Sequence, residues 1–174
     1  MEKMQENKDC EIKTLSIVVD NVAGVLYKVT SVFSRRGFNI DSLAVGTTER
    51  AEYSRITVKI HATAAQVSHL VTQLEKLPCV SKVVVLEETS MIQRELIVIK
   101  VKADSKTRGE IIEIVNIFRG KIIDLSPESV IVEITGEDDK AEAVIRMLSK
   151  FEIIELARTG IVALGRGRNS IYGA

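Results

Sequence analysis

The sequence predicts an α+β protein built from two tandem units, each with the element order βαββαβ. Segments of alternating apolar and polar residues, typical of strands, are interleaved with segments whose apolar residues recur every three or four positions, typical of helices. The same order recurs about 80 residues further along the chain, and such a repeat is stronger evidence for the architecture than any single element. Hydrophobic residues make up 45% of the 174 residues, enough for a core in each unit.

In the first unit, four segments have the alternation typical of strands. They are residues 14–19, 38–45, 54–61 and 80–86. Residues 25–36 form an amphipathic helical pattern, with Gly37 where a C-terminal cap belongs. A second helix is expected to begin at Thr63, because the four residues from Thr63 fit a capping box, and to stop at Pro78.

The second unit repeats this pattern. Its strands are expected at residues 96–101, 122–125, 130–134 and 153–164. One helix is expected over residues 107–118, closed by Gly120, and a second from an Asp138 cap to about residue 150. With residues 87–94 as the linker, the predicted domains are 12–88 and 93–168.

Each βαββαβ unit favours the ferredoxin-like arrangement. Two right-handed crossovers place both helices on one face of a four-stranded antiparallel sheet. The second strand then lies at an edge of the sheet. The other sheet face is expected to be uncovered, and to need either the other domain or another chain against it.

The overall composition excludes several classes of function. Lys plus Arg and Asp plus Glu are both 24, so there is no net positive charge to attract nucleic acid or an anionic membrane. No apolar run approaches the roughly 20 residues that span a bilayer. The charged residues 1–11 contain no apolar segment of a signal peptide, so we expect a cytoplasmic protein. Cys79 is expected to be a buried or inert thiol rather than half of a disulfide.

The residues also disfavour other activities of ferredoxin-like folds. Aromatic residues are 4%, and the first strand of each unit has none on which RNA bases could stack. His61 and His69 lie on different elements, as surface histidines rather than metal ligands. Residues 20–24 lack the arginine that a phosphoryl-transferring hydrolase of this fold would need. No nucleophile with a nearby base is apparent.

The turn from Asn21 to Gly24 is the most informative segment. Gly24 permits unusual backbone angles and close approach of a ligand. The first N–H groups of the following helix have no intrahelical acceptor and carry the positive end of the helix dipole, which suits a small carboxylate. An ordinary helix cap with an Asn/Gly turn explains the residues equally well, and both interpretations stay open at this point.

Five segments carry a family resemblance: Asn21-Val-Ala-Gly24-Val-Leu-Tyr-Lys28, Arg36-Gly-Phe-Asn-Ile-Asp-Ser-Leu43, Arg94-Glu-Leu96, Phe118-Arg-Gly-Lys-Ile-Ile-Asp124 and Ala157-Arg-Thr-Gly160. The chain from residue 14 to 167 resembles the regulatory, or small, subunit of acetolactate synthase. That family begins with an ACT domain, a ferredoxin-like amino-acid sensor. Lys28 departs from the family, which commonly has arginine there.

The resemblance implies a protein that is not itself an enzyme. It would bind the catalytic subunit of acetolactate synthase, activate it, and confer feedback inhibition by valine in branched-chain amino-acid biosynthesis. Thiamine diphosphate, magnesium and FAD would belong to that partner, with no cofactor, metal or catalytic residue here. An amino-acid-responsive transcription regulator is disfavoured, because neither a helix-turn-helix nor a basic face is apparent.

The resemblance also implies where valine would bind. In ACT homodimers the effector lies between protomers. Carried over to this chain, the site would be formed by Asn21, Gly24, Val25 and Leu26 of one copy with Asn39 and Ile40 of the other. The equivalent turn of the second domain, residues 104–107, has no Asn-x-x-Gly sequence. The second domain is therefore expected to lack an amino-acid site and to serve for contact with the catalytic chain.

Overall fold

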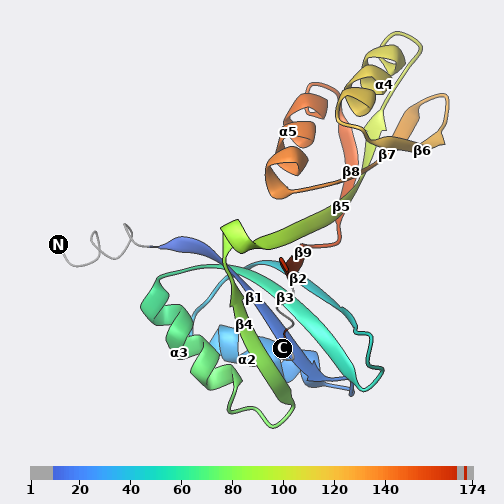
Figure 1. The fold of residues 1–174 in the computed structure, drawn as a ribbon. Helices are drawn as coiled ribbons and strands as arrows, with labels where there is room; N and C mark the ends of the chain where they lie inside the picture. Colours follow the sequence, from blue (N-terminus) through green and yellow to red (C-terminus); the bar gives the residue numbers. More distant parts are fainter. Residues whose placement is uncertain (1–9, 168–170, 172–174) are drawn as a thin grey trace. The chain divides into compact units, whose positions relative to one another are not determined.

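A computed structural model describes residues 10–167 and 171 (Figure 1). The chain divides into two compact units. The first runs to Ile92 and also takes in the chain from Ile161 onward, and the second spans Gln93–Gly160.

The first unit is an antiparallel sheet with the strand order β2-β3-β1-β4. Its elements are β1 (Glu11–Asp20), α2 (Val25–Arg35), β2 (Ile40–Thr47), β3 (Tyr53–Ala62), α3 (Ala64–Leu74) and β4 (Val80–Leu86). Both helices contribute to one core on one face of the sheet (Figure 1). This confirms the ferredoxin-like arrangement and the edge position of the second strand.

The alternation within β1 builds this core. Leu15, Ile17 and Val19 are fully buried and pack with Val29 and Phe33 of α2. Burying a side chain of this size stabilises a fold by about 1.5–3 kcal/mol relative to leaving it exposed. The core therefore fixes which faces of β1 and α2 point inward.

Local signals set the start of α3 and the end of α2 as predicted, whereas α3 ends at Leu74 and not at Pro78. The hydroxyl of Thr63 accepts a hydrogen bond from the Gln66 N–H at 3.3 Å, and the Gln66 side chain accepts one from the Thr63 N–H at 2.8 Å. At the end of α2, Gly37 has a φ of 72°, and the Phe38 N–H donates to the Phe33 carbonyl at 3.0 Å. The latter is the Schellman arrangement that a left-handed glycine allows.

The outer face of the first sheet is partly covered by the chain's own C-terminal segment. A short strand, β9 (Val162–Gly165), contacts β1 and β4, and the Ile161 N–H donates to the Ser42 hydroxyl at 2.8 Å. Ile161 packs with Met91 and Leu86. The expected partner for this face was the other domain or another chain. The cover is a segment of the predicted second domain, residues 93–168, and its strand β9 also pairs with β5 (Met91–Lys102).

The second unit repeats the topology with the strand order β6-β7-β5-β8. Its elements are β5 (Met91–Lys102), α4 (Arg108–Ile117), β6 (Lys121–Leu125), β7 (Ser129–Gly136), α5 (Asp138–Leu148) and β8 (Ile153–Arg158). Ile97 and Ile99 pack with Ile111 and Val144 in its core. Its helices α4 and α5 are again neighbours in the structure.

One expectation about the second unit was wrong. Residues 153–164 are not one strand, because the chain turns at Gly160, which has a φ of 78°, and then continues as β9 in the first unit. The boundary between the two units falls within the expected linker, residues 87–94, which consists of a 3₁₀ turn (Glu88–Ser90) and the start of β5. One continuous strand therefore leads from the first unit into the second.

The end of α4 differs from the expectation in one residue. Gly120 does take part in closing the helix, because its N–H donates to the Val115 carbonyl at 2.8 Å. The left-handed residue, however, is Arg119, with a φ of 52°. Gly120 is needed for space, since a Cβ there would lie 2.2 Å from Cδ1 of Ile134.

Glu95 and Arg158, from two of the family-like segments, form a bidentate ion pair between β5 and β8. Arg158 donates from Nε to Oε1 at 2.9 Å and from Nη2 to Oε2 at 2.5 Å, and also donates to Glu142 at 2.7 Å. The Glu95 side chain is only 2% exposed. The hydrogen bonds to Glu95 raise the pKa of Arg158 above its ordinary value, so the guanidinium stays charged.

Two further expectations concern cysteines and membranes. Cys10 and Cys79 are free thiols, and Cys79 is buried as predicted. The part of the chain that the structure describes contains no helix with the length and apolar character needed to cross a bilayer.

Candidate anion-binding site at the start of α2

The chain connects β1 to α2 through a tight turn that requires glycine. The Val25 N–H donates to the Val22 carbonyl at 3.3 Å, and Gly24 has φ 79° and ψ −1°. These angles are those of the third residue of a type II turn, where other residues are strained. No atom lies within 4 Å of the position that a Cβ on Gly24 would take, so the space beside the turn is open.

At the N-terminus of α2, no capping side chain accepts a hydrogen bond from the first N–H groups, and no acidic residue lies in the first turn. Gly24 is the N-cap residue and offers no side chain. Within residues 10–167, the N–H groups of Leu26 and Tyr27 have no hydrogen-bond acceptor, and Lys28 is the first to donate to the Gly24 carbonyl. Two free N–H groups at the positive end of a helix suit a carboxylate.

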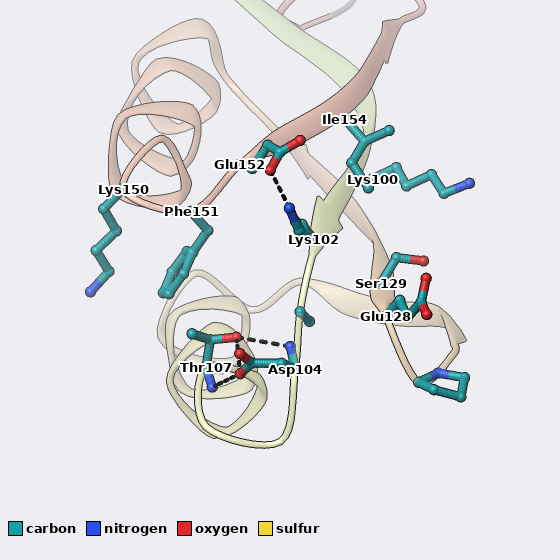
Figure 2. Close-up of a pocket in the computed structure, with 12 residues that line it drawn as sticks. Lys100, Lys102, Asp104, Thr107, Glu128, Ser129, Lys150, Phe151, Glu152 and Ile154 are labelled. Atoms are coloured by element: carbon teal, nitrogen blue, oxygen red, sulfur yellow. Dashed lines mark hydrogen bonds and ion pairs between the residues drawn. The ribbon is translucent and has the colours of Figure 1, made fainter.

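The other α-helices of the described residues have either a capping side chain or an acidic residue in the first turn. Thr63 caps α3, and α5 has Asp138 and Asp139 in its first turn. Before α4, the Asp104 carboxylate accepts from the N–H groups of Lys106 and Thr107, both at 2.8 Å. Figure 2 shows the contact with Thr107. Of these four helices, α2 alone lacks both a capping side chain and an acidic first turn.

Asn21 has a structural role that the sequence did not reveal. Its Nδ2 donates to the Ala51 carbonyl at 3.0 Å, and its Oδ1 accepts from the Ser54 hydroxyl at 3.1 Å. The Asn21 N–H also donates to the Glu52 carbonyl at 2.8 Å. The amide therefore ties the turn to the β2–β3 connection, and keeps one N–H and one lone pair for a ligand.

Within one chain, Asn39 and Ile40 lie far from this turn. In the sheet register Ile40 is level with Ile60 and Lys13, whereas the turn follows Asp20. Seven residues of an extended strand separate these levels, or about 23 Å at 3.3 Å per residue. The structure thus groups four predicted site residues, Asn21, Gly24, Val25 and Leu26, and separates them from the other two.

The grouped residues differ in what they offer. Val25 is buried, and its N–H is already taken by the turn, so it contributes core packing rather than a donor. Leu26 is half-buried against the core. Tyr27, which sequence reasoning did not single out, provides a free N–H and a side chain that is 77% exposed. The sequence could have indicated this exposure, because position 27 lies outside the apolar positions 25, 29, 32 and 33 of the helix.

The equivalent turn of the second unit borders a cleft of about 730 Å³ (Figure 2). Its lining includes an ion pair between Lys102 and Glu152 at 2.7 Å. Hydrogen bonds from Thr107 and Lys106 hold the pKa of Asp104 below its ordinary value, so this carboxylate is ionised at neutral pH. The second unit therefore supplies its own carboxylate where the first leaves the helix start free.

The described residues contain no group of three or more His, Cys, Asp or Glu side chains suited to a metal ion. His61 lies instead beside Asp41, at 3.4 Å. The free N–H groups of Leu26 and Tyr27 give the start of α2 the chemistry to bind an anion.

Comparison with known proteins agrees with both halves of the chain. Residues 15–82 match a family model described as an AHAS small subunit-like ACT domain, and residues 94–167 match one described as the small subunit of acetolactate synthase. The chain belongs to the acetolactate synthase small subunit family. The second match continues past Gly160 into β9, so the returning strand is part of the family's C-terminal segment.

Individual members of the family cover nearly the whole chain. The acetolactate synthase small subunit of Mycolicibacterium smegmatis is 47% identical over 92% of this chain and 95% of its own length. A probable acetolactate synthase small subunit of Archaeoglobus fulgidus is 47% identical over 88% and 96%. The crystal structure of the Thermotoga maritima small subunit matches with a TM-score of 0.86 at 40% identity, over 91% of this chain and 99% of that one.

Proposed function

We propose that this chain is a non-catalytic regulatory subunit that binds the catalytic subunit of acetolactate synthase, activates it, and makes it sensitive to valine. Family membership supports the catalytic subunit as the partner. The observation that carries the regulatory role is the open N-terminus of α2 beside Gly24. Thiamine diphosphate, magnesium and FAD would be held by the catalytic subunit, and both subunits would work in the cytoplasm.

Two groups of residues in the first unit would bind the parts of an amino acid, one at the start of α2 and one at the start of β2. The N–H groups of Leu26 and Tyr27 would bind the valine carboxylate. Amide oxygens of Asn21 and Asn39 would accept from its ammonium group. Leu26 and Ile40 would provide apolar contacts for the branched side chain.

A second copy of the chain is needed to bring these parts together. The edge strand β2 has no neighbour on its outer side within the described sheet. Antiparallel pairing of β2 with β2 of a second copy would place the start of one strand beside the end of the other. Asn39 and Ile40 of one copy would then lie near the Asn21–Gly24 turn of the other, which removes the separation of about 23 Å within one chain.

Regulation would follow from the shared site. Valine bound between two copies favours the association of the two ACT domains that binds it better, and shifts the equilibrium only by its differential affinity for the two states. If that state activates the catalytic subunit less, valine lowers activity. Coupling energies of about 1–3 kcal/mol correspond to roughly 5- to 150-fold changes.

Reconstitution with the catalytic subunit tests the proposal. The purified chain is added to acetolactate synthase catalytic subunit, and acetolactate formation is measured with and without valine. We expect stimulation by the chain alone, and loss of most of that stimulation on adding valine. Absence of stimulation would contradict the proposed partner, whereas stimulation without any valine effect would contradict the proposed effector.

A further inference from the structure

We propose that β6, the edge strand of the second unit, pairs antiparallel with β6 of a second copy of the chain. β6 is the end strand in the order β6-β7-β5-β8, and all five of its residues are exposed. Its outer row of backbone N–H and C=O groups therefore has no strand beside it within the described residues. Such a row can pair with a strand of another chain.

This edge exposes apolar side chains beside its charged residues Lys121 and Asp124. Ile123 is 51% exposed and Leu125 is 55% exposed. Ile117 is 70% exposed at the end of α4, a helix that contacts β6. Apolar side chains gathered at one exposed edge are typical of an interaction surface.

Comparison of the two repeated units shows that Ile123 replaces a charged residue of the first unit. In the first unit, β2 holds the same edge position and has a bulge between Ile40 and Ser42. In β6 the bulge falls at the same point, between Ile122 and Asp124. The bulged residue is Asp41 in the first unit, where it pairs with a histidine, and isoleucine at position 123 in the second. The second edge is therefore suited to a different contact.

The bulge also makes the strand self-complementary. Lys121 and Asp124 lie opposite Glu133 and Ile131, which are two residues apart on β7, so both point to the same face. A two-fold axis between Ile122 and Ile123 would place each Lys121 opposite Asp124 of the second copy. Each Ile122 would then lie against Ile123 of that copy. This match of opposite charges and apolar residues favours a second copy over an unrelated partner.

The proposal is independent of the valine site. Pairing of the ACT domains uses β2 of the first unit, whereas this contact uses only residues of the second unit. Either contact can exist without the other, and an experiment on β6 therefore needs a readout local to β6.

Charge-exchange variants provide that test. Lys121→Asp alone would place two Asp–Asp pairs across the two-fold axis, and Asp124→Lys alone would place two Lys–Lys pairs. A mixture of the two variants would restore both opposite pairs in a mixed assembly. Zero-length carbodiimide cross-linking, which joins a carboxylate to an amine in contact, reports on this edge even where another surface also holds the chains together.

We expect wild-type chains, mixed as isotopically light and heavy forms, to give an interchain cross-link between positions 121 and 124. Each variant alone has no carboxylate–amine pair at positions 121 and 124 and therefore serves as the blank, and the mixture should regain the cross-link. Arg146→Asp, on α5, makes the same charge change as Lys121→Asp at another exposed position and should leave the cross-link intact. Circular dichroism checks that each variant is folded.

Two results would overturn the proposal. The first is the absence of an interchain 121–124 cross-link in wild-type chains at concentrations where sedimentation shows self-association. The second is a mixture of the charge variants that cross-links no better than either variant alone. An unrelated protein as the occupant of this edge would produce the first result.

Discussion

At the scale of single residues, Gly24 controls access to the start of α2. Its φ of 79° sets the turn, and the open space beside it admits a ligand or a new side chain. Asp and Asn both tolerate left-handed backbone angles better than other non-glycine residues and differ little in size. The pair Gly24→Asp and Gly24→Asn therefore separates the effect of charge from the effect of strain.

We expect Gly24→Asp to abolish valine inhibition while leaving activation of the catalytic subunit intact. The introduced carboxylate would occupy the N–H groups that should bind the valine carboxylate and would repel it. Gly24→Asn adds a similar volume without the charge, so it should retain more of the inhibition. The measurement is acetolactate formation against valine concentration, with an expected rise of at least tenfold in half-inhibitory concentration for the Asp variant. Wild-type sensitivity in that variant would remove the assigned site.

The end of α4 gives a second prediction about single residues. Arg119 is left-handed, which costs an L-residue about 1–2 kcal/mol, so Arg119→Gly should stabilise the protein by about 0.5–1 kcal/mol. Gly120→Ala should destabilise it by about 1–3 kcal/mol, because the new methyl group would overlap Ile134. Gly109→Ala is the matched control, since it adds a methyl group in open space within the same helix and should be stabilising. Urea unfolding followed by circular dichroism measures all three.

At the scale of elements, much of the fold follows from local pattern. The capping box at Thr63 and the alternation in the strands predicted α3 and the sheet because those signals lie within a few residues. The return of residues 162–165 to the first unit was missed, because four residues carry too little pattern to separate them from β8. The left-handed Arg119 was missed because glycine, its neighbour, is the usual residue at such an angle.

In the candidate site, too, the local features could be predicted from the sequence and the long-range contacts could not. The residues of the Asn21–Gly24 turn are consecutive, so their proximity could be predicted directly from the sequence. The ties from Asn21 to Ala51 and Ser54 depend on how β2 and β3 are connected in space. The distance to Asn39 depends on the strand register, which no local signal fixes.

The ion pair between Glu95 and Arg158 joins two strands that are far apart in sequence. Glu95→Ala would leave part of the Arg158 guanidinium without its buried partner, although Glu142 and Asp138 would still contact it. Because Arg158 is one-third exposed, we expect a loss of about 2 kcal/mol rather than the larger cost of a fully buried pair.

A matched control lies one residue away. Arg94 pairs with Glu137 at 2.8 Å, but both side chains are at least half exposed, so Arg94→Ala should cost less than about 1 kcal/mol. Chemical denaturation of both variants measures the difference. Equal losses would show that burial of Glu95 does not strengthen its pair.

At the scale of the whole molecule, the proposed valine site belongs to two chains at once. The Asn21–Gly24 turn and Asn39 lie at opposite ends of the same sheet, so under this proposal neither chain would have a complete site alone. A variant of either part should therefore be complemented by a variant of the other. In a mixed dimer of Gly24→Asp and Asn39→Ala chains, one site combines the intact Gly24 with the intact Asn39, and the other site carries both changes.

We expect neither variant to bind valine alone and an equimolar mixture to recover about a quarter of the wild-type sites. Random pairing in a two-fold dimer makes half of the dimers mixed, and each mixed dimer has one intact site of two. Isothermal titration after dissociation and reassociation of the chains measures the number of sites. Asn39 is exposed, and its amide contacts only Asp41 among the described residues, so its replacement should leave the fold intact. A mixture without any recovered binding would mean that Gly24 and Asn39 do not meet across two copies, and valine sensing would then have to be separable from dimer geometry.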